Sequence, residues 1–202
     1  MTPERTPSTF SRRQWLGVAA GGGLWAALSG GVQAASAEAS APPLPDGVTR
    51  LVGAGARARG TARLRMLGLN IYDARLFAAD PFVPDRFQAS ALALELVYAR
   101  SLKGQRIAEA SLDEMRRGGA IPDEQAAQWL AFMSQAFPDV KAGYQIVGVW
   151  DPRESLSTFF VNGTAGRSLK DAAFGERFFG IWLAPHTSQP DLRLRLLGMA
   201  GR

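Results

Sequence analysis

The sequence predicts an α+β domain in which a layer of helices covers one face of an antiparallel sheet. Between residues 49 and 100, apolar and polar residues alternate in short runs, which is the pattern of half-buried strands. From 104 to 137, apolar residues instead recur every three or four positions, as they do along the buried stripe of a helix. Strands and helices therefore come in separate groups, which favours hairpin-connected strands over β-α-β units.

Four strands are expected before the first long helix, over residues 49–58, 61–67, 69–77 and 91–100. A turn at Arg59–Gly60 is expected to separate the first two. In the fourth run, leucines occupy every second position, so they face the core while Glu95 faces away from it.

Two long helices are expected next, over residues 104–117 and 122–137. The second starts with acidic residues in its first turn, where carboxylates meet the positive end of the helix dipole. Asp113 and Glu114 are neighbours on the first helix and diverge by about 100°. They are therefore expected on its solvated side and not as an acid/base pair.

Strands are expected to return over residues 144–150 and 156–161. Asn162–Gly163 then predicts a tight hairpin turn, because both residues tolerate a positive φ. Ser168 followed by Asp171 resembles a capping box for the last major helix. That helix carries an aromatic face expected to pack in the core or line an apolar cleft, and a short helix follows over 188–197.

The N-terminus predicts an export signal. Ser11-Arg12-Arg13 is followed by an uncharged, glycine-rich run that continues to Glu38, which is the layout of a twin-arginine signal peptide. Cleavage after Ala34 or after Ala37 fits the small-residue rule equally well. The alternative is an uncleaved membrane anchor, since the run is about long enough to span a bilayer.

On the export reading, residues 1–34 are the signal peptide, 35–47 a flexible linker rich in Ala, Ser and Pro, and 48–202 the working domain. The protein is then expected in the periplasm, with no stable membrane span after cleavage.

The composition excludes several kinds of site. The chain has no cysteine and one histidine, so disulfides, thiolate zinc sites and multi-histidine metal sites are ruled out. His186 lies between two expected helices and is expected to be solvated. The net charge of +5 is dispersed and not gathered in a stripe, which argues against nucleic acid as a partner. No cofactor is expected.

Several strings, in this order, resemble the chalcone isomerase family. They are Leu51–Arg57, Leu69–Tyr72, Leu102–Gln105 at the start of a helix, and Ser168–Trp182. The similarity spans about residues 48 to 198 and is greatest to exported bacterial members. It implies a large antiparallel sheet, helices on one side and a ligand cleft between them. Enzymes of the family close a chalcone into a flavanone, whereas other branches bind fatty acids.

The resemblance argues against flavonoid cyclisation. Arg57 matches the family arginine that attracts a phenolate or a carboxylate. The enzyme's threonine falls at Met66 or Leu67, its tyrosine at Ile107 and its asparagine at Glu114. Most of the polar network that polarises water and the ketone is therefore missing, and no catalytic residue is assigned.

Three residues are candidates for ligand contact. The turn at Arg59–Gly60 lets Arg57 point inward, where a guanidinium would pair with an anion. Tyr72 is a core tyrosine whose hydroxyl is expected at the cleft rim. Thr164 lies near the last polar position of the family.

The expected function is binding of a small hydrophobic or amphipathic ligand, such as a fatty acid, as an anion held by Arg57. Two alternatives stay open. One is an intramolecular lyase or isomerase acting on an unknown substrate. The other is an envelope scaffold that binds a protein partner.

Overall fold

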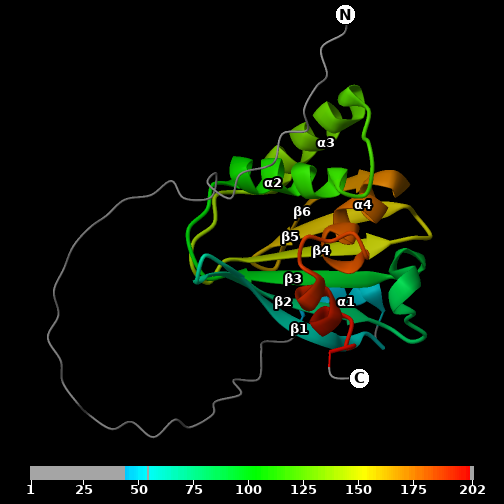
Figure 1. The fold of residues 1–202 in the computed structure, drawn as a ribbon. Coiled ribbons are helices and arrows are strands. Elements are labelled where there is room, and N and C mark those ends of the chain that lie inside the picture. Colours follow the sequence, from blue (N-terminus) through cyan, green and yellow to red (C-terminus); the bar gives the residue numbers. More distant parts are fainter. Residues whose placement is uncertain (1–43, 54, 201–202) are drawn as a thin grey trace, which may run out of the picture. The chain divides into compact units, whose positions relative to one another are not determined.

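Six strands form one antiparallel sheet in the part of the chain that the structure describes, and their spatial order follows their order in the sequence (Figure 1). The computed structural model describes residues 44–53 and 55–200. The predicted signal peptide and most of the predicted linker lie outside these residues. The strands are β1 (Arg57–Met66), β2 (Leu69–Ala78), β3 (Leu92–Tyr98), β4 (Gln145–Asp151), β5 (Leu156–Val161) and β6 (Thr164–Lys170).

Helices form a layer on one face of this sheet (Figure 1). They are α2 (Gly104–Arg116), α3 (Asp123–Ala136), α4 (Ala172–Leu183) and α5 (Pro190–Leu196), with a short 3-10 helix, η2 (Pro84–Ala89), beside them. Their apolar stripes and one face of the sheet make the main core, in which aromatic rings predominate. The predicted α+β architecture is confirmed. Among the described helices, none is both long and apolar enough to cross a membrane.

A shorter helix, α1 (Asp46–Val52), packs on the opposite face of the sheet. Val48 and Val52 are one helical turn apart and are buried in a second apolar cluster with residues of β3, β4 and β5. The predicted strand over 49–58 is therefore wrong for its first half. Tertiary burial of two valines prevails over their strand propensity, and β1 begins only at Arg57. Asp46 and Gly47 belong to this helix, although they were expected in the linker.

Because both faces are covered, β3 is buried on both sides. Glu95 points away from the main core as predicted, yet its side chain is 0% exposed. The carboxylate pairs with Arg75, whose Nη2 donates at 2.7 Å, and accepts a hydrogen bond from Gln145 Nε2 at 2.6 Å. Removing one partner from such a buried group generally costs about 3–5 kcal/mol. The ion pair therefore ties three neighbouring strands together.

The approach to α4 differs from the prediction. Ser168 belongs to β6 and does not start the helix. The cap is Asp171, whose Oδ1 accepts from the backbone N–H of Phe174 at 3.0 Å and whose Oδ2 accepts from Trp129 Nε1 at 2.8 Å. One carboxylate thus starts α4 and binds it to α3.

Two hairpins of the sheet have the same kind of turn but different residues. Asn162–Gly163 joins β5 to β6 with φ of 48° and 81°, which confirms the predicted turn. Leu67–Gly68 joins β1 to β2 with φ of 51° and 79°. Asparagine tolerates the left-handed region, whereas a leucine there is strained by roughly 1–2 kcal/mol. The leucine in this turn is thus unexplained by the fold.

We expect Leu67→Asn to raise the free energy of unfolding by about 1 kcal/mol, because it relieves this backbone strain. The matched change Asn162→Leu should lower it by at least as much, since it also removes the bond from the Gln145 N–H to Asn162 Oδ1. Urea unfolding of the full chain measures both. Equal stability of the two variants would contradict the comparison.

Candidate functional site

The three predicted contact residues do not lie together. Arg57 pairs with Ala78 at the start of the edge strand β1, and Thr164 is exposed at the start of β6, the opposite edge. Tyr72 lies on β2, opposite Tyr98 of β3. At about 4.8 Å per strand, the two edges are roughly 24 Å apart. A single small ligand therefore cannot contact all three residues.

Arg57 does not point inward, so that prediction is wrong. Its side chain is 66% exposed and its Nη2 pairs with Asp80 Oδ2 at 2.7 Å. The expected turn at Arg59–Gly60 is instead a β-bulge within one continuous strand. The bulge buries the neighbouring Arg59, which is 13% exposed and donates from Nε to Ala78 O at 3.0 Å.

Of the three predicted residues, Tyr72 is the one that is half-buried against the main core and has a polar partner there. Its hydroxyl accepts a hydrogen bond from Trp182 Nε1 at 2.9 Å, across 110 residues of sequence. Its ring meets Tyr98 edge-on, with centroids 5.9 Å apart. Burial raises the pKa of Tyr72 well above its usual value, the bond from Trp182 opposes this, and the charge of Glu114 raises it further. The hydroxyl is therefore neutral at physiological pH and keeps its proton, which it can donate.

Glu114 of α2 is a residue that the sequence reasoning placed on a solvated face. Its side chain is only 34% exposed, and Oε2 is buried without a hydrogen-bond donor among the described residues. The closest cationic atom that pairs with it is Arg117 Nε, at 3.6 Å. Its charge helps raise the pKa of the Tyr72 hydroxyl, so the two groups are close enough to interact electrostatically. Its match to a polar position of the family enzymes was the one signal that could have identified it.

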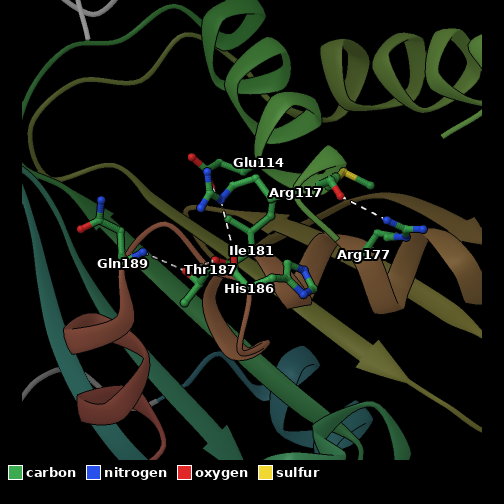
Figure 2. Close-up of polar contacts among 8 residues, drawn as sticks. Glu114, Arg117, Arg177, Ile181, His186, Thr187 and Gln189 are labelled. Carbon is green, nitrogen blue, oxygen red and sulfur yellow. Dashed lines mark hydrogen bonds and ion pairs between the residues drawn. The ribbon is translucent and has the colours of Figure 1, made fainter. Parts of the chain in front are cut away.

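The C-terminal end of α2 is tied to α4 and to the segment after it, next to Glu114 (Figure 2). Arg117 Nε donates to His186 O at 3.2 Å. Arg177 Nη1 donates to Gly119 O at 3.0 Å and to Met115 O at 3.5 Å. Arg177 thus satisfies carbonyls where α2 ends, a position at which cations are favoured by the helix dipole, and Arg117 joins that end to the segment after α4.

His186 is exposed, as predicted, but it is not isolated. A Cβ added at Gly118 would lie 2.8 Å from its Nε2, so the ring rests against that glycine. Partial burial, followed by the charges of Arg177 and Arg117, lowers the pKa of His186 below 6.5.

The residues that match the threonine and tyrosine positions of the family enzymes have no hydroxyl group. Met66 is half-buried at the end of β1, Leu67 is exposed in the turn, and Ile107 is buried in the main core. Within the described part of the chain, no group of three His, Asp or Glu side chains is arranged to hold a metal ion. The candidate site therefore rests on the Tyr72–Trp182 hydrogen bond and on Glu114, whose charge acts on Tyr72.

Comparisons with known proteins agree with this architecture. A family model described as chalcone isomerase-like matches residues 47–198. The fold is similar to the crystal structure of a fatty-acid binding protein of Arabidopsis thaliana, with a TM-score of 0.55 and 14% identity over 73% of this chain and 89% of that one. At this identity, the likeness shows the fold alone.

A relative in sequence is an uncharacterized protein of Haemophilus influenzae, 29% identical over 107 residues. The match covers 53% of this chain and 52% of that protein, so the chain spans about half the length of this curated relative.

The lowered pKa of His186 predicts a pH effect on stability. The folded state binds a proton less readily than the unfolded state, so stability should fall as the pH drops below 6.5 and level off below the folded pKa. Urea unfolding of the full chain at pH 7.5 and pH 5.5 measures this loss. His186→Gln should make it smaller, and an unchanged loss in that variant would assign it to other groups.

Proposed function

The chain belongs to the chalcone isomerase-like family, and on this premise we propose that it binds a small amphipathic ligand between its sheet and its helix layer. One observation carries the proposal: the Tyr72 hydroxyl accepts a hydrogen bond from Trp182 Nε1, and Glu114, whose Oε2 is buried without a hydrogen-bond donor among the described residues, acts on that hydroxyl electrostatically. Binding sites for small molecules are typically of this kind, apolar with a few convergent polar groups. The Arabidopsis protein of similar fold is named a fatty-acid binding protein, which supports a fatty-acid-like ligand.

These polar groups indicate which end of a ligand they would bind. Trp182 holds the Tyr72 oxygen, leaving the tyrosine proton to be donated to a ligand oxygen. The buried Oε2 of Glu114 needs a donor. A protonated carboxylic acid supplies both an acceptor and a donor, since two carboxyl groups in one low-dielectric site share a proton. We therefore propose a fatty acid bound with uptake of one proton.

The same geometry argues for binding over flavonoid cyclisation. Met66, Leu67 and Ile107 replace the hydroxyl-bearing residues of the enzymes and cannot polarise a ketone. An intramolecular lyase is the second candidate, favoured by the electrostatic interaction between a phenol acid, Tyr72, and a carboxylate base, Glu114. Turnover of a chalcone panel by the wild type and its loss in Tyr72→Phe would support that candidate instead.

Laurate binding tests the proposal. Tyr72→Phe removes the donor to the ligand and the acceptor of Trp182, so the affinity should fall about tenfold. Isothermal titration of the full chain measures the dissociation constants. Arg57→Ala and Thr164→Ala are surface controls expected to bind like the wild type. Loss of binding in Arg57→Ala alone would place the polar end at the edge of the sheet and overturn the proposal.

Glu114→Gln is the matched variant for the shared proton. Wild-type affinity should rise as the pH falls, by up to about tenfold per pH unit for one coupled proton. The amide keeps the size of the side chain but does not need that proton, so the pH dependence should disappear. A flat pH profile in the wild type contradicts proton uptake.

We also propose that residues 1–34 export the folded domain to the periplasm by the twin-arginine route. The support is the pair Arg12–Arg13 ahead of an uncharged run that contains small-residue cleavage sites. Replacing both arginines by lysine should retain the protein in the cytoplasm when cell fractions are probed. Unchanged distribution between the fractions would rule the route out.

A further inference from the structure

The turn between β1 and β2 forms an exposed apolar tip, made of Met66, Leu67, Gly68 and Leu69. Leu67 is 57% exposed and Leu69 43% exposed, among the most exposed large apolar side chains of the described residues. The tip lies at the end of the sheet where the segments after β3 and before β4 also lie (Figure 1). Backbone bonds join that end, from Ala99 N to Ile71 O at 2.9 Å and from Gly143 N to Tyr98 O at 2.8 Å.

The fold does not require a leucine here. Asn162–Gly163 forms a turn with nearly the same φ angles in the same sheet, and its asparagine accepts a backbone hydrogen bond that Leu67 cannot accept. Leu67 therefore occupies a strained conformation without a packing partner to justify it. A strained, exposed leucine that does not contribute to packing indicates a functional role, such as contact with another molecule.

The side chains around the tip are mainly basic. Arg65 is exposed and donates from Nε to the neutral Asn70 Oδ1 at 2.9 Å, so its charge is not neutralised. Arg100 and Lys141 lie in the adjacent segments and have no carboxylate partner within the described part of the chain. Arg63 and Lys103 pair with Asp73 and Asp139. The end of the sheet that carries the apolar tip thus has an excess of positive charge.

We propose that this tip docks the domain onto an anionic lipid surface. Leu67 and Leu69 enter the interface between headgroups and acyl chains, while Arg65, Arg100 and Lys141 face the phosphates. Two leucines on a protruding turn offer far less than the roughly 800 Å² per partner of a stable protein interface. A fluid lipid surface, in contrast, accepts a small apolar protrusion with basic flanks.

Docking at this end also has a consequence for the proposed ligand. Tyr72 follows Leu69 by three residues on β2, so the polar group of the candidate site lies near the end that meets the lipid. The docking itself does not depend on ligand binding, and it is tested without a ligand.

The test uses the full chain and vesicles of three parts phosphatidylcholine to one part phosphatidylglycerol, with pure phosphatidylcholine vesicles as the comparison. In co-sedimentation, Leu67→Asn should lower the partition coefficient about tenfold. Because this variant keeps the turn and relieves its strain, loss of binding cannot be ascribed to misfolding. Arg65→Gln should lower it about fivefold on the anionic vesicles. Asn162→Leu should bind like the wild type.

A site-specific probe separates the tip from the rest of the chain. The protein has no cysteine, so Leu67→Cys and Asn162→Cys each give one attachment point for an environment-sensitive dye. Emission from position 67 should shift to the blue on anionic vesicles, and emission from position 162 should not. Equal emission at both positions, or equal sedimentation of wild type and Leu67→Asn, overturns the proposal. So does a Leu67-dependent dimer in ultracentrifugation without vesicle binding, which would make the tip a contact between protein copies.

Discussion

The burial of β3 on both faces is the constraint around which the rest of the domain is arranged. One face of the sheet carries the helix layer and the aromatic core, and the other carries α1. A strand covered on both sides leaves no solvated position, yet β3 contains Glu95. The Arg75–Glu95 ion pair and the bond from Gln145 satisfy that carboxylate and hold β2, β3 and β4 together. Buried polar atoms that lack such partners among the described residues include Glu114 Oε2 and Ser157 Oγ, and an unsatisfied charged group is the stronger candidate for a ligand contact.

By that criterion, Glu114 stands apart from Glu95. Both carboxylates have a buried oxygen, but the oxygens of Glu95 accept short bonds from two side chains, whereas Oε2 of Glu114 has, among the described residues, only an arginine at 3.6 Å. A buried acceptor without a donor is rare in folded proteins and costs about 1–3 kcal/mol or more. Because Glu114 also acts electrostatically on the neutral Tyr72, its open acceptor fits a role in holding a ligand better than a role in stability.

The sequence predicted the elements whose periodicity is set locally. The alternation in β2 and β3, the apolar stripes of α2 and α3, and the Asn162–Gly163 turn all follow from residues near each other in the chain. It did not predict α1, because two valines in a short apolar run are compatible with a strand until the sheet they bury is known. It also missed the bulge at Arg59, which reverses the inward and outward positions before it and turns Arg57 to solvent.

The candidate site, too, could be predicted from local sequence only in part. Tyr72 was identified from its place in a core strand, but its partner Trp182 is 110 residues away and only the fold brings the two together. Glu114 was assigned to solvent because helix geometry separates it from Asp113, and that geometry does not show which face α4 covers. Family position alone suggested Arg57, and local strand geometry then placed it elsewhere.

The central claim is that Tyr72, Trp182 and Glu114 form the polar end of a ligand site. The indole N–H resonance of Trp182, assigned with Trp182→Phe in a 15N spectrum, reports on this group directly. Titration with laurate should move that resonance in a saturable way, with the same dissociation constant as calorimetry. A resonance that stays fixed while calorimetry shows saturable binding would place the ligand elsewhere and contradict the claim.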